Sequence, residues 1–248
     1  PKNIQNKKMV MVQEGMTDPE NVVFHIVKKI RKIPRYFAGT ASTGLSDYYT
    51  YFCVASEGYK DVFIRKGIKT EKLIVTGIPN FDNCHEYLNN DFPYKNYSLV
   101  CTSDSRETFK FENRKEFILN ALNLSEKKQM IFKLHPNENV PRATREINKW
   151  APGSLIYSSG NAYEMIANCD ILITMYSSVV YVGLALGKKV YSAFELKDLT
   201  KQLPIQNGGS SAKNIATVCE TLIEGSQKKS ELDPSNTDSK FDVSYQTA

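Results

Sequence analysis

The 248-residue sequence lacks several patterns that would define its chemistry directly. Its apolar runs are too short to span a bilayer, and no signal peptide is visible. The five cysteines are widely spaced, odd in number and without a CxxC pair, so neither a zinc site nor a disulfide framework is expected. We therefore expect reduced thiols in a cytoplasmic protein.

Familiar nucleotide and nucleic-acid signatures are also missing. Neither GxGxxG nor a Walker A sequence occurs, which argues against dinucleotide oxidoreductases and P-loop kinases. Basic residues exceed acidic ones by 32 to 27 and are interspersed with them. This pattern predicts no nucleic-acid partner, although it suits an anionic ligand or an anionic membrane surface without requiring either. His25 and His85 have no metal-ligating residue at a useful spacing, so no metal site is expected.

What the sequence does contain is an alternation of apolar runs and amphipathic segments. With 41% hydrophobic and 24% charged residues, the chain can bury a sizeable core. The alternation predicts an α/β fold with parallel sheets that helices cover on both faces. Strands are expected at 8–12, 51–55, 72–76, 97–102, 130–134, 155–157, 171–175 and 189–192, and helices at 19–32, 57–66, 112–122, 142–150, 162–167, 179–186 and 211–223.

A polar, proline-containing segment at 86–96 predicts a linker between two domains. Residues 76–80 (TGIPN) predict a fixed structural corner just before it. We assign 1–95 to a partial N-terminal Rossmann-like domain, 96–225 to a C-terminal Rossmann-like domain and 226–248 to a polar tail. About 95 residues are too few for a whole Rossmann domain, so the N-terminal half is expected to be incomplete or built differently.

Small polar loops follow the strands of the C-terminal half, at 103–105 (SDS), 135–137 (HPN), 158–160 (SSG) and 176–178 (YSS). Ligands of open parallel sheets bind beyond the carboxyl ends of the strands. Hydroxyl groups and backbone amides at such positions suit a phosphate. The four loops therefore predict an anion site at this edge of the sheet.

His135 is the strongest candidate in these loops. An imidazolium at a strand end could donate to a leaving phosphate, and Pro136 would fix the turn that presents the ring. The alternative is a histidine satisfied by the loop backbone. Lys133 shares His135's side of the strand and would add positive charge, though a structural lysine is as compatible with the pattern.

Two further pairs of residues carry candidate chemistry. Ser177 and Ser178 precede a helix, where their hydroxyls and the first helical amides would bind an anion or serve as a plain helix cap. Glu14 and Gly15 follow the first strand. Glu14 could deprotonate an acceptor hydroxyl, while Gly15 would let substrate approach the backbone. A solvated turn glutamate is the alternative, and Asp18 is a competing base or a cap of the next helix.

The order of these segments resembles a known group of enzymes. A strand followed by QEG (13–15), VTGIPNFD (75–82), KLHPNE (133–138) and CDILITMYSSVVYVGLALGKKV (169–190) resembles glycosyltransferases of the two-Rossmann-domain GT-B fold. More narrowly, it looks like the bacterial sialyltransferase, polysialyltransferase and Kdo-transferase group. It is also similar to CDP-glycerol glycerophosphotransferases.

The resemblance implies a function and roles for individual residues. The enzyme would transfer a sugar from a cytidine nucleotide donor (CMP-sugar or CDP-glycerol) to a surface glycan acceptor, in bacterial capsule or lipopolysaccharide synthesis. It would work by inverting displacement with no metal ion or cofactor, in the cytoplasm or at the inner face of the cytoplasmic membrane. Glu14 would be the base and His135 the leaving-group acid or clamp. The nucleotide-sugar would contact Ser103, Lys133, Pro136, Asn137, Tyr157, Ser158, Glu164, Ser177 and Ser178.

One departure from the pattern bears on the alternatives. Many retaining GT-B enzymes and the UDP-GlcNAc 2-epimerases place a ribose-binding glutamate in the helix after the Ser-Ser turn. This chain has Tyr181 and Val182 there, which counts against an epimerase. Two alternatives stay open: a UDP-GlcNAc 2-epimerase-like enzyme and a non-catalytic subunit that binds nucleotide-sugar or glycan. The base, sugar, acceptor and oligomeric state are not fixed by these patterns.

Overall fold

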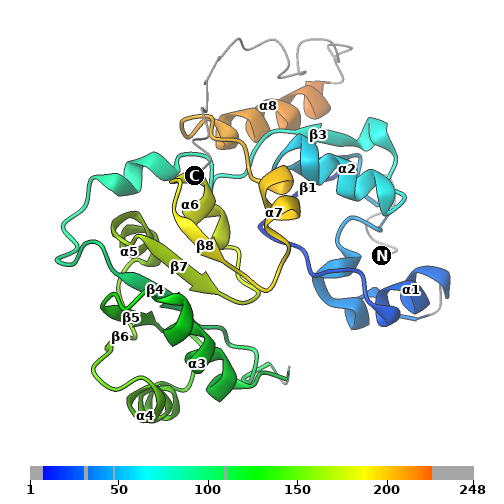
Figure 1. Ribbon diagram of the computed structural model, residues 1–248. Coiled ribbons are helices and arrows are strands. Elements are labelled where there is room, and N and C mark those ends of the chain that lie inside the picture. The colour runs from blue at the N-terminus through cyan, green and yellow to red at the C-terminus, as the bar shows by residue number, and fades with distance from the viewer. Residues whose placement is uncertain (1–7, 31–32, 47, 109–110, 225–248) are drawn as a thin grey trace.

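The computed structural model describes residues 8–30, 33–46, 48–108 and 111–224. Two sheets form the framework, and within the described residues their strands pair in parallel (Figure 1). The N-terminal sheet has the order β1 (Val10–Val12), β2 (Tyr51–Val54), β3 (Leu73–Val75). The C-terminal sheet has the order β6 (Leu155–Tyr157), β5 (Met130–Lys133), β4 (Ser98–Cys101), β7 (Ile171–Thr174), β8 (Lys189–Tyr191). The predicted α/β fold with parallel Rossmann-like sheets is confirmed.

The central strands of the C-terminal sheet are buried along their whole length, because helices cover both faces. Every residue of β4, β5 and β7 is buried, as near-continuous apolar runs require. On one face, α3 (Arg114–Leu124) and α4 (Val140–Trp150) supply Phe117, Ile118 and Ile147 to one apolar cluster. On the other face, α5 (Ala162–Asn168) and α6 (Val180–Ala185) join a core shared with the N-terminal sheet.

The helices of the N-terminal half begin and end by local capping. Ser56 accepts the Tyr59 N–H and starts α2 (Glu57–Arg65), and Gly67 follows it with φ +96°, as predicted. Helix α1 (Val22–Lys29) starts later than predicted, and Asn21 caps it. The expectation that Asp18 caps this helix is therefore wrong.

Four short elements were not predicted from the sequence. Three are 3₁₀ helices, a class usually limited to a few residues. They are η2 (Arg35–Ser42), η3 (Thr70–Lys72) and η4 (Cys84–Leu88), and the fourth element is α7 (Leu196–Gln202).

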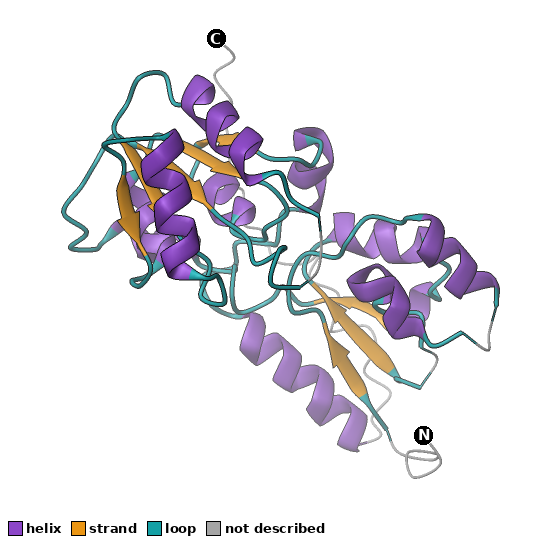
Figure 2. Cartoon of the chain, turned by 90° about the horizontal axis from the view of Figure 1, so that it is seen from below, coloured by secondary structure: helices purple, strands orange, loops and turns teal. Residues whose placement is uncertain are grey.

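After the C-terminal sheet, the chain returns to the N-terminal half. Helix α7 packs so closely on α2 that a Cβ at Gly58 would lie 1.8 Å from the carbonyl oxygen of Lys201. Helix α8 (Ser211–Glu224) lies beside the smaller sheet (Figure 2), and its Leu222 carbonyl accepts a hydrogen bond from Lys8. Packing therefore groups α7 and α8 with the N-terminal sheet, whereas the predicted division placed 96–225 together. The predicted tail, 226–248, lies outside the described residues.

The corner at 76–80 joins β3 to this returning segment. Gly77 has φ +75°, and a Cβ there would lie 2.2 Å from Ser211 Oγ, so only glycine fits. The Asp82 carboxylate accepts the Ser211 N–H at 3.0 Å. The corner is therefore fixed against the start of α8.

A pair of buried phenols links the two halves. Tyr59 on α2 and Tyr181 on α6 are fully buried, and their hydroxyl oxygens are 2.7 Å apart. Burial raises the pKa of Tyr59 to about 12 and also raises that of Tyr181. Phe81 packs edge-on against Tyr181. In the described part of the chain, no helix is long and apolar enough to cross a membrane.

Candidate functional site

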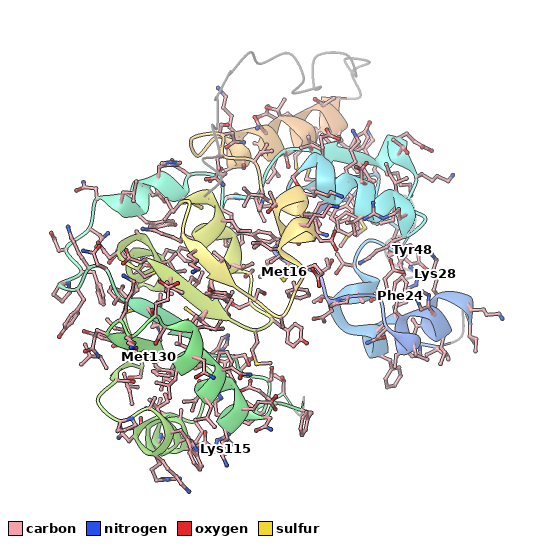
Figure 3. The ribbon with its side chains drawn as sticks, viewed as in Figure 1. Met16, Phe24, Lys28, Tyr48, Lys115 and Met130 are labelled. Carbon is pink, nitrogen blue, oxygen red and sulfur yellow. The ribbon has the colours of Figure 1, made fainter. Side chains whose placement is uncertain are left out.

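A cleft of about 560 Å³ lies between the two halves of the chain, at the carboxyl ends of β1, β4, β5 and β7. This volume is within the range of small-molecule sites. Met16, labelled in Figure 3, lines it on the N-terminal side. The remaining lining comes from both halves: Met11, Val12, Gln13, Glu14, Gly15, Thr17, Asp18, Thr40, Thr43, Asn80, Phe81, Thr102, Ser103, Asp104, His135, Tyr163, Tyr176, Ser177, Ser178 and Phe194.

The position of the cleft follows from the strand order. The chain runs from β4 outward through β5 to β6, and then returns to the other side of β4 with β7. Such a reversal opens a crevice between the carboxyl ends of the two diverging strands. The loops that leave these strands carry Ser103 and Asp104 after β4, and Ser177 and Ser178 after β7. All four residues line the cleft.

His135 follows β5 and is presented to the cleft as predicted, with 35% of its side chain exposed. The backbone N–H of Asn137 donates to its Nδ1 at 3.2 Å. A neutral ring in this arrangement carries its proton on Nε2. Asp104 Oδ2 lies 3.7 Å from the same Nδ1. The loop backbone therefore satisfies one ring nitrogen and leaves Nε2 as a donor.

Ser177 and Ser178 do not cap the following helix. Residue Val179 occupies the N-cap of α6, and no side chain makes the capping bond. Within the described residues, neither serine hydroxyl makes a hydrogen bond, while both backbone carbonyls accept from the helix. The interpretation of the pair as a plain helix cap is wrong, and both hydroxyls are available at the cleft.

Glu14 and Gly15 form the opposite wall, at the end of β1. The side chain of Gln13 holds this turn, because it accepts the Ala55 N–H at 2.9 Å and donates to the Gly15 carbonyl at 2.8 Å. A Cβ added to Gly15 would lie 3.8 Å from Ser178 Cβ. The two turns therefore face each other so closely that one added carbon atom at Gly15 would reach contact distance of Ser178. The positioning role of Gln13 was not predicted.

Charge in the cleft is unevenly distributed. Glu14, Asp18 and Asp104 are its acidic lining residues, and His135 lies among them. No lysine or arginine lines it among the described residues. Lys133 was expected to add positive charge, but its ammonium is buried and donates to the Leu134 carbonyl at 3.0 Å.

Ser103 lines the cleft, but its hydroxyl hydrogen is used in a hydrogen bond to Glu112. Its hydroxyl lies 2.5 Å from Glu112 Oε2, and a carboxylate can only accept. The contact with Ser105 Oγ at 2.9 Å must then use the Ser105 proton. Ser103 can therefore offer a bound phosphate its loop backbone but not its hydroxyl hydrogen.

Several predicted contact residues lie outside the cleft lining. Tyr157 packs against Phe92 of the linker, with ring centroids 5.5 Å apart. The Glu164 carboxylate accepts from the Asn161 side chain at 3.0 Å, at the start of α5. Asn137 donates to Asp104 at 3.2 Å. Pro136 and Ser158 are exposed outside the lining. From this region Tyr163 lines the cleft instead, which periodicity could not have indicated because it lies in the first turn of α5.

A cluster of charged side chains lies behind the C-terminal wall. Arg106 forms a bidentate ion pair with Glu146, and both hydrogen bonds are 2.8 Å long. This hydrogen bonding lowers the pKa of Glu146. Arg114 contacts Glu112 and Glu138, both buried. We call this set the charged cluster: Arg106, Glu107, Glu112, Arg114, Glu138, Arg142 and Glu146. In the described part of the chain, no group of acidic, histidine or cysteine side chains is placed to hold a metal ion.

Comparison with known proteins finds similarity in structure only. No protein-family model matches the sequence, and a search of curated proteins finds no match. Among solved structures, MnaA of S. aureus with UDP has a TM-score of 0.58 at 10% identity, over 88% of this chain and 68% of its own. UDP-GlcNAc 2-epimerase from Neisseria meningitidis, bound to UDP-GlcNAc, has 0.56 at 15%, over 88% and 70%.

A third structure agrees with these two. UDP-GlcNAc 2-epimerase from Methanocaldococcus jannaschii, in complex with UDP-GlcNAc and UDP, has a TM-score of 0.53 at 15% identity, over 85% of this chain and 75% of its own. Similarity at this level of identity defines the fold alone. The chain is an α/β protein built from two Rossmann-like parallel sheets of the GT-B type.

Proposed function

We propose that the protein is a glycosyltransferase that uses a nucleotide-activated sugar, with Glu14 as base and His135 as the group that meets the leaving phosphate. The observation that carries this proposal is the meeting of three turns at one cleft. His135, the Ser177–Ser178 pair and the Glu14–Gly15 turn all line it. They come from both sheets, so one ligand can touch all three.

The chemistry follows from the two walls. On the C-terminal wall, the Nε2 proton of His135 and the hydroxyls of Ser177 and Ser178 donate to phosphate oxygens as the sugar–phosphate bond breaks. On the N-terminal wall, the Glu14 carboxylate accepts the proton of an acceptor hydroxyl that attacks the sugar carbon. Attack from the side opposite the leaving phosphate inverts the configuration at that carbon. The imidazole is held through Nδ1 by the Asn137 N–H, so it needs little reorganisation as charge develops.

The charge of the cleft supports a donor with one phosphate. Three carboxylates and one histidine line it, and each additional phosphate charge must be held near those carboxylates. The single phosphate of a nucleoside monophosphate sugar carries one negative charge fewer than the two phosphates of a diphosphate sugar. A CMP-sugar is therefore favoured over CDP-glycerol or a UDP-sugar. The proposed acceptor is a surface glycan, and its hydroxyl would enter beside Glu14.

A second candidate is a UDP-GlcNAc 2-epimerase-like enzyme. Two of the structures described above favour it, because they are UDP-GlcNAc 2-epimerases with bound UDP-GlcNAc, and the third, MnaA, holds UDP. Against it stands Tyr181, which occupies the position expected for a ribose-binding glutamate and is buried against Tyr59. A non-catalytic nucleotide-sugar-binding subunit would use the same cleft without turnover.

The test is ligand-dependent stabilisation with a matched pair of histidine variants. A ligand that binds only the folded state raises the melting temperature. We expect CMP to raise it more than CDP or UDP. His135→Ala should remove most of the CMP effect, while His85→Ala, an exposed histidine outside the cleft, should keep it. A response to UDP and UDP-GlcNAc alone would select the epimerase, and CMP binding without transfer or hydrolysis of CMP-sugar would select the binding subunit.

A further inference from the structure

Behind His135, the carboxylate of Glu138 is fully buried within the charged cluster. Its side chain has no solvent exposure, although it lies three residues after a cleft residue. The Glu138 N–H donates to the His135 carbonyl at 3.0 Å, which closes a turn. A buried carboxylate is costly to desolvate unless several partners hold it. The groups that contact the two Glu138 oxygens are therefore the groups whose positions this carboxylate can fix.

One carboxylate oxygen of Glu138 faces arginine. Its Oε1 lies 2.7 Å from Arg114 Nη2 and 3.6 Å from Arg106 Nη2. Arg114 continues the contacts, because its Nε is 2.5 Å from Glu112 Oε1 and its Nη2 donates to the Ser103 carbonyl at 3.2 Å. Glu138 is thereby fixed, and it is tied to the loop that follows β4.

The other oxygen of Glu138 faces Thr102, which lines the cleft. The Thr102 hydroxyl donates to Glu138 Oε2 at 2.5 Å. The same Thr102 oxygen accepts the backbone N–H of His135 at 3.1 Å. Because the carboxylate can only accept, it fixes the direction of the Thr102 proton and leaves a lone pair for His135.

We infer that Glu138, acting through Thr102, is a positioning residue. It fixes the backbone of His135 relative to the loop that carries Ser103. The assignment deepens the proposed function, because the group positioned is the one assigned to the leaving phosphate. Glu138 does not touch the cleft. It acts by fixing the backbone of a turn whose Asn137 N–H in turn fixes the imidazole through Nδ1.

The test combines nitrogen NMR of the imidazole rings with binding of CMP. The chain has three histidines, so each ring signal can be assigned by substitution, with His25 and His85 as internal references. Wild-type His135 should show the Nε2–H form, because Nδ1 accepts from Asn137. Thr102→Val keeps the ion pairs of Glu138 and removes only the hydroxyl. It should move the His135 nitrogen chemical shifts toward those of an imidazole that exchanges between its two neutral tautomers.

Matched variants separate positioning from a general loss of stability. Thr102→Ser retains the hydroxyl and should restore the wild-type His135 signals. Glu138→Gln should shift them as Thr102→Val does. Glu146→Gln removes a carboxylate from the same cluster without touching Thr102, and it should leave the His135 signals unchanged. The affinity for CMP should fall about tenfold in Thr102→Val, as expected when one hydrogen bond to the turn is lost.

Unchanged His135 signals in a folded Thr102→Val protein would overturn the inference, as would an equal shift in Glu146→Gln. Failure of the proposed function gives a different result. In that case the wild type does not bind CMP, while Thr102→Val still shifts the ring signals and Thr102→Ser restores them, so the positioning role stands without the proposed ligand.

Discussion

The two walls of the cleft are held in different ways. On the N-terminal wall, one neutral amide, Gln13, joins the end of β1 to the end of β2 and fixes the Glu14–Gly15 turn. On the C-terminal wall, the charged cluster connects the turn at His135 to the loop at Ser103. The two walls carry facing candidate groups, but one depends on two hydrogen bonds and the other on buried charge.

The difference follows from which elements lie beside each connection. The acidic-Gly turn leaves the sheet beside a neighbouring strand, so a single side chain can bridge it to that strand. The loops after β4 and β5 extend beyond the sheet before α3 and α4 begin. Side chains from both helices and both loops hold them. Hydrogen bonds between charged groups are stronger than those of a neutral amide. Burying the charges costs more desolvation free energy.

The largest effect should come from removing one charge from the C-terminal wall. Glu138→Ala leaves Arg114 buried without this partner, and breaking a buried ion pair costs about 3–5 kcal/mol of unfolding free energy. Chemical denaturation should show this loss. Glu71→Ala, an exposed glutamate on η3, should stay within about 0.5 kcal/mol of wild type. A loss under about 1 kcal/mol for Glu138→Ala would show that the cluster is not the main support of this wall.

A smaller loss is expected on the N-terminal wall. Gln13→Ala leaves the Ala55 N–H and the Gly15 carbonyl without their partner, which costs about 1–3 kcal/mol by the same measurement. Gln129→Ala is the matched control, because Gln129 is exposed and donates to backbone carbonyls at 3.1 and 3.2 Å. Equal losses for the two glutamine variants would contradict the bridging role of Gln13.

The smallest effect concerns acid stability, and it should appear in the C-terminal wall alone. Hydrogen bonding to Arg106 lowers the pKa of Glu146 below its usual 4.5. A carboxyl group whose pKa falls on folding stabilises the protein above the unfolded-state value, and that contribution disappears as the pH falls through the folded-state value. Glu146→Gln should therefore be less stable than wild type at pH 7, and the gap should narrow below pH 4.5.

Denaturation at a series of pH values checks this result. Gln13→Ala removes no ionisable group, so its loss relative to wild type should be the same at every pH. A constant gap for Glu146→Gln would show that the Arg106 pair contributes no pH-dependent stability. Glu146 is partly exposed, with 28% of its side chain accessible, so solvent screening keeps the effect modest.

Much of the framework could be predicted from the sequence. The strands are short apolar runs, and the central ones bury both faces. Their positions are therefore visible from residue type alone, with ends shifted by a residue or two. The cleft loops were also predictable, because parallel strands place their carboxyl ends at one edge. His135, Ser177 and Ser178 line one cleft for that reason, and Glu14 lines it from the end of β1 in the other sheet.

Features that depend on distant partners could not be predicted. The return of α7 and α8 to the N-terminal sheet rests on contacts such as that of Gly58 with Lys201, which no local pattern encodes. Lys133 alternates with His135 along the strand, yet burial and a carbonyl partner turn its ammonium away from the cleft. Glu112, nine residues from Ser103, accepts the hydrogen bond of the Ser103 hydroxyl, which was expected to donate to a phosphate.

The tyrosine pair between the two halves bears on how a ligand enters and leaves. Tyr59 and Tyr181 are completely enclosed, so a swing of one sheet away from the other would separate two hydroxyls in a place that water does not reach. Each stranded hydroxyl would cost about 1–3 kcal/mol. A rigid-body opening of the cleft that separates α2 from α6 therefore carries this cost, whereas a rearrangement of side chains at its mouth does not.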